Sequence, residues 1–463
     1  MPDARLTELI RSMPRLQVLT APNDLEYYGQ DWTRRWVPAP LAIALPGSVE
    51  EVQTIVRWAN AWKVAIVPSG GRTGLSGGAV AANGELVLSL ERMNRVLHFD
   101  PVDRHLTVQA GITLQAVHIA AGEHGLIYPV DLASRGSCSI GGNIATNAGG
   151  IRVIRHGSTR DWIAGLKVVT GTGELLDLNR GLVKNSSGYD FRHLLIGSEG
   201  TLGVVVETLL KLTEPMPRSQ VMLLGLPAAE ALMQVFDLFR AQLSLQAFEF
   251  FSDRALAHVL EHGAQRALDS DHPYYVVLEF DAANEAAQKC GMEAFARAQD
   301  QGWVSDGVIA QSDAQASALW RLRESITESL AAYQPYKSDV SVRISVLPGF
   351  MGEMQAVLAR ECPQVEVIWF GHIGDGNMHI NVLRPEAIAE DAFAQLCERV
   401  TALLASTLHR HGGSISAEHG VGMAKREYLQ SSRSLAEIEL MRGVRKVFDP
   451  NGILNPGKLV DAN

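Results

Sequence analysis

The sequence predicts an α+β protein with two domains and a C-terminal helical segment. Over residues 41–212, short apolar runs of strand length alternate with helical segments, and after residue 217 the pattern changes to two strand–helix–strand units. The 463 residues suffice for two or three substantial cores, and the 42 glycines indicate many tight loops. We place the boundaries of the three parts at residues 1–215, 216–415 and 416–463.

The first part begins with a predicted strand at residues 41–45, a helix at 49–62 and a second strand at 64–67 that enters a glycine-rich turn. Further strands are predicted at 86–90 and 106–110, followed by a helix at 114–124. Residues 163–170 and 174–178 form a predicted hairpin across three turn residues, 171–173. A run rich in β-branched residues, 203–212, predicts the last strand.

The second part follows Pro215 and Pro217, which indicate a linker. One β-α-β unit is predicted from residues 220–224, 228–240 and 246–251. A second is predicted from residues 274–280, 283–299 and 307–310. Two such units favour a ferredoxin-like antiparallel sheet covered by helices.

Composition excludes several classes of protein. The formal net charge of −10 argues against a nucleic-acid partner, because phosphate binding needs a basic surface. No apolar run reaches transmembrane length, and the N-terminus lacks the pattern of a secretory signal. The four cysteines are far apart and form no Cys-x-x-Cys pair, so we expect reduced thiols in a cytoplasmic protein.

A hairpin is predicted at residues 370–381, with Asp375-Gly376 as a type I′ turn. That register would place His372 opposite His379, with the imidazoles on one face roughly 5 Å apart at Cβ. Asn381 lies two residues further along the same face. The hairpin therefore predicts part of a metal site, and we expect it to extend the ferredoxin-like sheet.

The remaining metal ligand is predicted at Glu418, because two His and one Glu form a common set of zinc ligands with one position open. His419 would then be available as a general base beside the metal. The alternative is a pair of surface histidines on a tight turn, with Glu418 solvated.

Three glycine-rich segments, 68–78, 129–150 and 184–203, lie in the first part of the chain. Glycine allows the backbone to approach a ligand closely and to direct N–H groups at phosphate oxygens. None of them is a Gly-x-Gly-x-x-Gly fingerprint or a phosphate loop, and the near miss at 452–458 lacks the hydroxyl residue. Tight turns between strands explain any one segment equally well, but not all three.

The three segments, together with the ending at residues 448–458, resemble the FAD-binding proteins of the vanillyl-alcohol oxidase and p-cresol methylhydroxylase (PCMH) superfamily. The resemblance implies a two-subdomain PCMH-type FAD-binding domain at residues 1–215, a substrate domain at 216–415, and a segment at 416–463 that returns to the flavin. Members with covalent flavin carry a histidine in the first segment, where this chain has Arg72-Thr73, so we expect non-covalent FAD. The implied FAD-binding residues are Pro68, Gly70, Gly71, Arg72, Thr73, Gly74, Gly77, Pro129, Asp131, Ser137, Gly141, Gly142, Asn143, Asn147, Glu199, Gly203, Val205 and Asn455.

Residues 371–377 with 418–420 are similar to the D-2-hydroxy-acid dehydrogenase branch of that superfamily. That branch oxidises a 2-hydroxy acid by transferring the C2 hydride to flavin N5 beside a divalent metal. The resemblance implies His372, His379 and Glu418 as metal ligands, with zinc expected, and His419 as the base.

Arg323 and Lys337 resemble the carboxylate-binding residues of that branch, and the expected substrate residues are Arg323, Thr327, Lys337 and Asn381. Residues 320–327 are predicted to form one helix, with Arg323 and Thr327 on one face. Two cations would suit a second carboxylate, which favours D-2-hydroxyglutarate. Arg343 stands where related chains often carry proline, so D-lactate and D-malate stay open. A solvated helix face and a loop lysine are the alternatives.

Two other classes of protein remain open from the sequence: a flavin-free metalloprotein and a flavin-binding scaffold without turnover. The metal could also be manganese or cobalt. The electron acceptor is left open between an electron-transfer flavoprotein, a quinone and oxygen. The sequence does not determine the oligomeric state, with a homodimer as one option.

Overall fold

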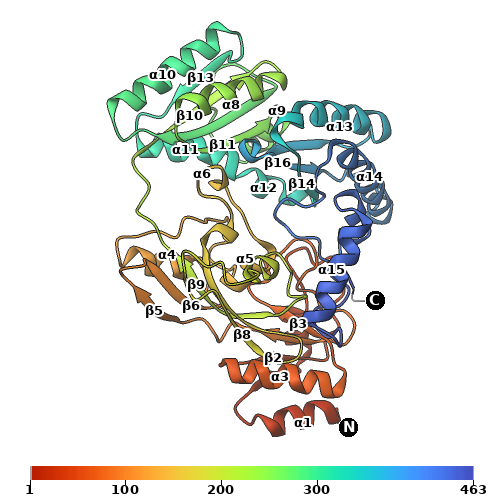
Figure 1. The fold of residues 1–463 in the computed structure, drawn as a ribbon. Coiled ribbons are helices and arrows are strands. Elements are labelled where there is room, and N and C mark those ends of the chain that lie inside the picture. Colours follow the sequence, from red (N-terminus) through yellow and green to blue (C-terminus); the bar gives the residue numbers. More distant parts are fainter. Residues whose placement is uncertain (1–2, 462–463) are drawn as a thin grey trace. The chain divides into compact units, whose positions relative to one another are not determined.

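The computed structural model describes residues 3–461, which divide into two compact units. The first unit holds the chain up to Gly150, Gly157–Pro215, and the chain from Glu418 onward. The second holds Ile151–His156 and Met216–Ala417. Figure 1 labels many of the helices and strands of both units.

The first unit contains a four-stranded sheet in the order β1-β2-β4-β3, with β2, β4 and β3 parallel. Its strands are β1 (Gln17–Leu19), β2 (Ala42–Leu45), β3 (Ile66–Ser69) and β4 (Leu86–Ser89). Helix α3 (Val49–Trp62) connects β2 to β3 and has the bounds predicted from the sequence. The helix begins there because the Ser48 side chain accepts the Glu51 amide N–H, which caps the first turn.

A five-stranded antiparallel sheet in the order β5-β6-β9-β7-β8 completes the core of the first unit. Its strands are β5 (Val96–Asp100), β6 (His105–Gln109), β7 (Ile163–Val169), β8 (Leu175–Leu178) and β9 (Val204–Lys211). The predicted β7–β8 hairpin is confirmed. The helical elements of this unit are α1 (Ala4–Ser12), α2 (Pro22–Tyr28), α4 (Leu114–Gly122), α5 (Ile140–Thr146), η1 (Thr159–Trp162), α7 (Arg192–Leu195), η5 (Arg426–Ser431) and α15 (Leu435–Phe448).

The second unit is built on a seven-stranded antiparallel sheet in the order β13-β10-β12-β11-β15-β16-β14. The first four strands have the ferredoxin-like order predicted from the two β-α-β units. The strands are β10 (Ser219–Leu226), β11 (Leu245–Ser252), β12 (Tyr274–Asp281), β13 (Asp306–Ile309), β14 (Tyr336–Ser341), β15 (Val367–Gly371) and β16 (Asn377–Val382). The predicted hairpin extends this sheet through β15, which pairs with β11.

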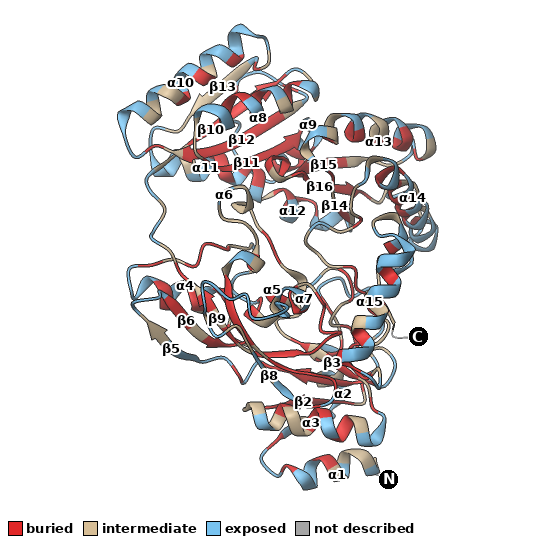
Figure 2. Ribbon diagram, viewed as in Figure 1, coloured by how far each residue is buried: buried red, intermediate tan, exposed pale blue. Residues whose placement is uncertain are grey.

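Helices cover both faces of this sheet, whose buried strands are red in Figure 2. On one face, Gly291 of α10 (Glu285–Asp300) lies so close to the Phe280 ring that an added Cβ would stand 2.5 Å from it. On the other face, Trp320 and Ile326 share a buried cluster with Phe251. The other helical elements are α6 (Val153–His156), α8 (Glu230–Gln242), α9 (Asp253–Glu261), α11 (Asp313–Glu324), α12 (Ile326–Ser329), η2 (Ala331–Tyr333), η3 (Ile344–Val346), α13 (Leu347–Glu361), η4 (Ile373–Asp375) and α14 (Glu390–His411).

The predicted register of the β15–β16 hairpin is wrong. His379 pairs with Phe370 rather than with His372, and the strands are joined by a longer loop that contains the 3₁₀ turn η4. Gly376 ends that turn in the left-handed region, with φ +86°, whereas Asp375 does not have a positive φ. Asp375-Gly376 therefore closes a helical turn and does not form a type I′ hairpin turn.

The predicted single helix over residues 320–327 is also wrong. Helix α11 ends at Glu324, and the short α12 starts at Ile326. As a result Arg323 is buried whereas Thr327 is exposed, so the two side chains do not share one environment. No helix within residues 3–461 is long and apolar enough to cross a membrane.

Candidate active site

Two imidazoles meet at the β15–β16 connection even though the register differs from the prediction. The His372 and His379 ring centroids lie 5.3 Å apart at an interplanar angle of 80°. Their potential ligand nitrogens lie within 4.8 Å of each other. The loop after β15 thus brings His372 back toward the strand residue His379, and the pair can supply two ligands to one metal ion.

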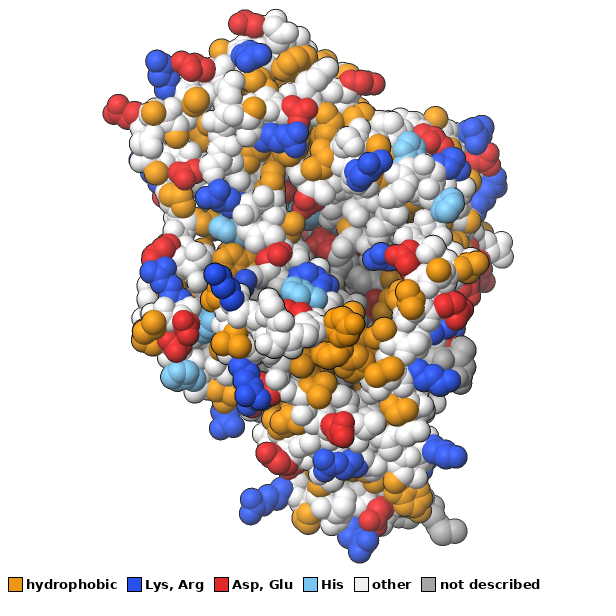
Figure 3. Space-filling view, in the orientation of Figure 1, with side chains coloured by type: hydrophobic (Ala, Val, Ile, Leu, Met, Phe, Trp, Pro, Cys, Tyr) orange, Lys and Arg blue, Asp and Glu red, His pale blue; other side chains and the backbone are white. Residues whose placement is uncertain are grey.

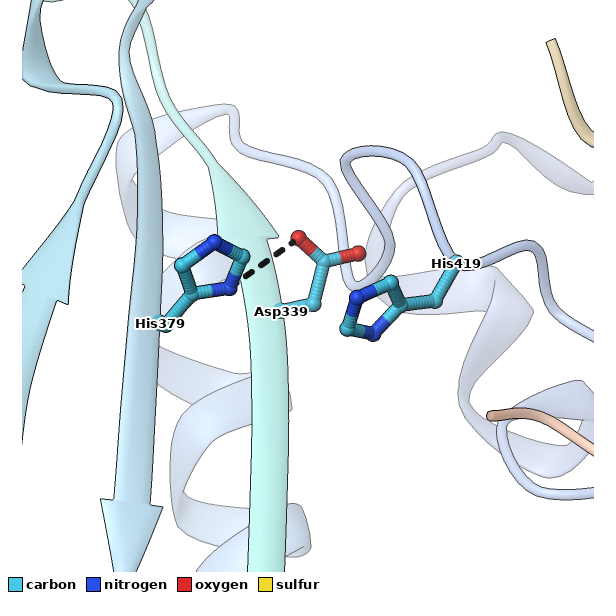
Figure 4. A group of neighbouring side chains, drawn as sticks. All are labelled: Asp339, His379 and His419. Atoms are coloured by element: carbon cyan, nitrogen blue, oxygen red, sulfur yellow. Dashed lines mark ion pairs between the residues drawn. The ribbon is translucent and has the colours of Figure 1, made fainter. Parts of the chain in front are cut away.

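Each imidazole has its Nδ1 near a carboxylate. His372 Nδ1 lies 2.9 Å from Oε1 of Glu249 on β11, and His379 Nδ1 lies 3.9 Å from Oδ1 of Asp339 on β14. Figure 4 draws the Asp339–His379 ion pair. Because a carboxylate oxygen accepts a hydrogen bond, Nδ1 of His372 carries the proton in the His372–Glu249 pair. The 3.9 Å contact between His379 and Asp339 is too long for a hydrogen bond.

Asp339 is fully buried and connects β14 to the chain that follows α14. Its Oδ1 accepts a hydrogen bond from Asn377 Nδ2 at 2.8 Å. Its Oδ2 accepts the Ala417 amide N–H at 3.1 Å. Glu418 and His419 belong to the first unit but directly follow Ala417 in the chain. Glu418 is therefore bonded directly to Ala417, whose backbone N–H donates to Asp339.

Three of the predicted substrate residues, Asn381, Lys337 and Arg323, lie on the same side of the second unit's sheet as His379. Asn381 is two residues further along β16 and pairs with Lys337 on β14. The guanidinium of Arg323 lies 4.9 Å from the centroid of the Phe370 ring, and Phe370 pairs with His379.

The charged side chains considered for substrate binding differ in their surroundings. Arg323 is buried and has a carboxylate partner, Glu249 Oε2, 3.0 Å from its guanidinium. Lys337 is half-buried, and desolvation lowers the pKa of its ammonium group. Arg343 is exposed at the start of η3.

The predicted flavin-binding residues all lie in the first unit, where the glycine-rich segments pack on one another. A Cβ on Gly70 would stand 2.0 Å from Ser139 Oγ, and one on Gly71 would stand 1.9 Å from the Ser137 carbonyl oxygen. The Glu199 amide N–H donates to the Ala145 carbonyl at 2.8 Å. Glycine is therefore required for the close packing of the first two segments. Residues 184–190 of the third segment are exposed instead.

The C-terminal segment returns to these loops. Asn455 Nδ2 donates to the carbonyl oxygens of Gly78 at 2.9 Å and of Glu199 at 2.7 Å. The buried Glu199 carboxylate accepts the amide N–H groups of Val421 and Gly422, both at 2.7 Å. Burial raises the pKa of Glu199, and the two amide donors oppose that effect. The residues just after Glu418 and His419 are thereby fixed to the FAD-binding part of the chain.

Several polar atoms near the three segments are buried without a hydrogen-bonding partner among the described residues. They are Ser69 Oγ, Asp131 Oδ1, Asn143 Nδ2 and Asn455 Oδ1. Buried polar groups are normally paired, so this mixed set of donors and acceptors fits a bound group with many polar atoms, such as FAD.

Three of the predicted flavin residues have contacts within the protein itself. Asn147 Oδ1 accepts hydrogen bonds from Ser158 Oγ and from the Arg160 amide. A Cβ on Gly203 would stand 2.4 Å from Val168 Cγ1, and Val205 is buried in the core. The roles assigned to these residues, to Glu199 and to the other predicted flavin residues stay predictions.

Sequence reasoning missed Glu249 and Asp339. Each is a carboxylate within a buried strand, at 1% and 0% exposure. The available signal was chemical: Glu249 interrupts an apolar strand, and a buried charge requires a partner.

Comparisons with known proteins relate both parts of the chain to described families. A family model described as "FAD binding domain" matches residues 40–179, and one described as "FAD linked oxidases, C-terminal domain" matches residues 216–459. The chain is 67% identical over 463 residues to "D-2-hydroxyglutarate dehydrogenase" of Xanthomonas citri pv. viticola, covering 100% of this chain and 98% of that protein. It is 52% identical over 447 residues to the protein of the same name from Stutzerimonas stutzeri, covering 96% of each. A "Putative D-lactate dehydrogenase" of Schizosaccharomyces pombe is 35% identical, covering 95% of this chain and 86% of that protein.

Solved structures show the same fold at low sequence identity. The p-cresol methylhydroxylase structure with substrate bound aligns with a TM-score of 0.77 and 15% identity, covering 100% of this chain and 98% of that one. A 4-ethylphenol oxidase from Gulosibacter chungangensis aligns with a TM-score of 0.73 and 17% identity, covering 99% and 96%. The α+β, PCMH-type fold expected from the sequence is confirmed.

On the face drawn in Figure 3, basic and acidic side chains are interspersed and do not gather in a basic patch.

Proposed function

Since this chain belongs to the FAD-linked oxidases and is an FAD-dependent oxidoreductase, we propose that it oxidises D-2-hydroxyglutarate to 2-oxoglutarate. One observation carries the proposal: the His372–His379 pair and the buried Arg323 lie on the same side of the sheet. The Arg323 guanidinium lies over the ring of Phe370, which pairs with His379. One part of this face suits a metal that binds the 2-hydroxy acid end, and the other suits a second carboxylate. Relatives at 67% and 52% identity that carry this substrate's name support the choice.

The oxidation removes two groups from the substrate: the proton of the 2-hydroxyl and a hydride from C2. FAD, when bound, accepts the hydride. We assign proton removal to His419, because imidazole changes its protonation state nearest to neutral pH. The Glu199 contacts with Val421 and Gly422 support this role, because they fix the chain next to His419.

For the metal, we propose His372, His379 and Glu418 as ligands, with zinc as the ion. A divalent metal supplies positive charge that stabilises the developing alkoxide. The proposal is supported by the His372–His379 pair, whose possible ligand nitrogens lie within 4.8 Å of each other, and by the hydrogen bond from Ala417, the residue before Glu418, to Asp339. We propose that Asn381 contacts the 2-hydroxy acid end of the substrate and that Arg323 and Lys337 bind the distal carboxylate, with Thr327 at its edge.

The electrons must leave the reduced flavin to a partner, and we propose an electron-transfer flavoprotein or a quinone. The four cysteines, Cys138, Cys290, Cys362 and Cys397, are free thiols, which supports a reducing, cytoplasmic location. The proposed location and a homodimeric state can be tested by fractionation and by light scattering.

Steady-state turnover of the purified protein with an artificial dye acceptor tests the substrate. The panel contains D- and L-2-hydroxyglutarate, D-malate and D-lactate. We expect kcat/KM for D-2-hydroxyglutarate to exceed that for D-lactate by about 10²-fold, because two cations are matched to its second carboxylate. Equal values for the two acids would favour a D-lactate dehydrogenase, the function suggested by the name of the S. pombe relative.

A further inference from the structure

Glu249 occupies the centre of the second unit's sheet, where a carboxylate needs a specific reason to be present. It is 1% exposed and lies on β11, between β12 and β15. Its neighbours on the same face, Ala247 and Phe251, belong to a hydrophobic cluster. Burying a carboxylate is unfavourable unless it is paired, so its partners indicate what it does.

The two oxygens of Glu249 have different partners. Oε1 lies 2.9 Å from His372 Nδ1, and Oε2 lies 3.0 Å from the Arg323 guanidinium. Phe250 of β11 pairs with Gly371 of β15. The next residues along these antiparallel strands are Glu249 and His372, so the register brings their side chains together. One carboxylate thus connects a proposed metal ligand to a proposed substrate-binding cation.

The contact with Arg323 is an ion pair without hydrogen-bond geometry. Glu249 Oε2 and Arg323 Nε are buried and have no hydrogen-bonding partner among the described residues. The charge of Arg323 is therefore compensated while its Nε–H remains free for another acceptor, such as a carboxylate oxygen.

We propose that Glu249 is a positioning residue that sets the metal affinity of the site through His372 and holds Arg323 for the substrate. The proposal rests on the proposed function. Glu249 fixes the His372 tautomer by accepting from Nδ1–H, and its negative charge makes Nε2 a stronger ligand. Its effect on the reaction passes through its two contacts, with His372 and with Arg323.

Glu279 provides a matched control. It is buried at 5% exposure on the adjacent strand β12 and pairs with Ala247, two residues before Glu249. It forms an ion pair with Arg152 at 3.3 Å. Replacing Glu279 by Gln therefore removes a buried charge from the same sheet face without changing the carboxylate next to His372.

The test measures zinc affinity directly. The full-length flavoprotein is stripped of metal, and zinc is titrated against a chromophoric chelator for the wild type, Glu249→Gln and Glu279→Gln. We expect Glu249→Gln to weaken zinc binding by about 10- to 100-fold, and Glu279→Gln to change it by less than about 2-fold. Equal weakening in both variants, or none in Glu249→Gln, would overturn the proposal.

Glu249→Asp keeps the negative charge, and it is the second test variant if Glu249→Gln does not fold. It withdraws the carboxylate from His372, and we expect it to weaken zinc binding by roughly 10-fold; wild-type affinity would overturn the proposal. A wild-type protein that binds no divalent metal overturns both this proposal and the metal site. Zinc binding that depends on Glu249, without oxidation of any 2-hydroxy acid, supports the role of Glu249 and overturns only the proposed activity.

Discussion

The Glu199 carboxylate accepts a hydrogen bond of 2.7 Å from the amide N–H of Val421, which lies three residues after Glu418. The second oxygen accepts from Gly422, so one buried side chain satisfies two consecutive backbone donors. This pair of bonds fixes the segment that follows the proposed ligand Glu418 and the proposed base His419.

Replacing Glu199 by Ala should destabilise the protein and lower kcat together. Two buried N–H groups would lose their acceptor, at a cost of about 1–3 kcal/mol each. We expect kcat to fall by at least about 10-fold, because His419 would lose its fixed position. Thermal unfolding and steady-state kinetics measure the two effects.

Glu207→Ala is the control for Glu199, because Glu207 lies on β9 in the same unit and forms an ion pair with Lys167. We expect kcat of this variant to stay within about 2-fold of the wild-type value, since surface ion pairs contribute little. A similar loss of kcat in both variants would contradict a specific role for Glu199.

Replacing Arg323 by Met should discriminate between substrates. Methionine is also long and unbranched, but it lacks the charged donors that Arg323 places over the Phe370 ring. We expect kcat/KM for D-2-hydroxyglutarate to fall by about 10²-fold, with a smaller loss for D-lactate, because only the first has a distal carboxylate.

The exposed Arg321 is the control for Arg323, because it lies on the same helix, α11. Arg321→Met should leave both kcat/KM values within about 2-fold of wild type. Equal losses for the two acids in Arg323→Met would show that Arg323 does not read the distal carboxylate.

Lys458 should make stability depend on pH in the alkaline range. It is buried at 1% exposure, its Nζ donates to the Val80 carbonyl at 2.7 Å, and burial lowers its pKa from 10.5 to about 8. Between these two values the unfolded state binds more protons than the folded state, so the contribution of Lys458 to the free energy of unfolding rises with pH.

Comparing the wild type with Lys458→Met isolates that contribution. From about pH 8 to about pH 10.5, the wild type should gain stability relative to the variant by up to roughly 3 kcal/mol. Denaturant unfolding at both pH values provides the measurement. A stability difference between the two proteins that is independent of pH would be inconsistent with the lowered pKa.

The sequence allowed much of the fold to be predicted, because local signals determine it. The bounds of α3 follow from the apolar spacing after the Ser48 cap, and the ferredoxin-like order follows from two β-α-β units. The β15–β16 register could not be predicted in this way. Gly371, with φ +155°, and the η4 turn form a longer connection than a dipeptide turn signal indicates.

The candidate site was only partly predictable for a related reason. His372 and His379 are close in the sequence, and their spacing pointed to a shared site. Glu249 is far from both in the sequence and reaches His372 only through the pairing of β11 with β15. Residues that act through long-range strand pairing leave no local pattern, apart from the buried charge itself.

The histidine pair makes a prediction about metal removal. His379→Ala should abolish zinc binding and lower kcat by at least about 10³-fold, because it removes one of three ligands. The exposed His409 on α14 serves as the control, and His409→Ala should retain both properties. Zinc content by elemental analysis and turnover with a dye acceptor decide the outcome. Full turnover by metal-free His379→Ala would rule out a metal-dependent mechanism.

The most direct measurement is the reduction of the bound flavin by substrate in the absence of oxygen. D-2-Hydroxyglutarate is mixed with the zinc-loaded protein and with the chelator-treated protein, and the absorbance of oxidised flavin is followed in a stopped-flow instrument. The account predicts rapid bleaching with the D-enantiomer only, its loss after chelation and its recovery with zinc. Flavin that stays oxidised in the zinc-loaded protein, or bleaches equally fast without metal, would contradict it.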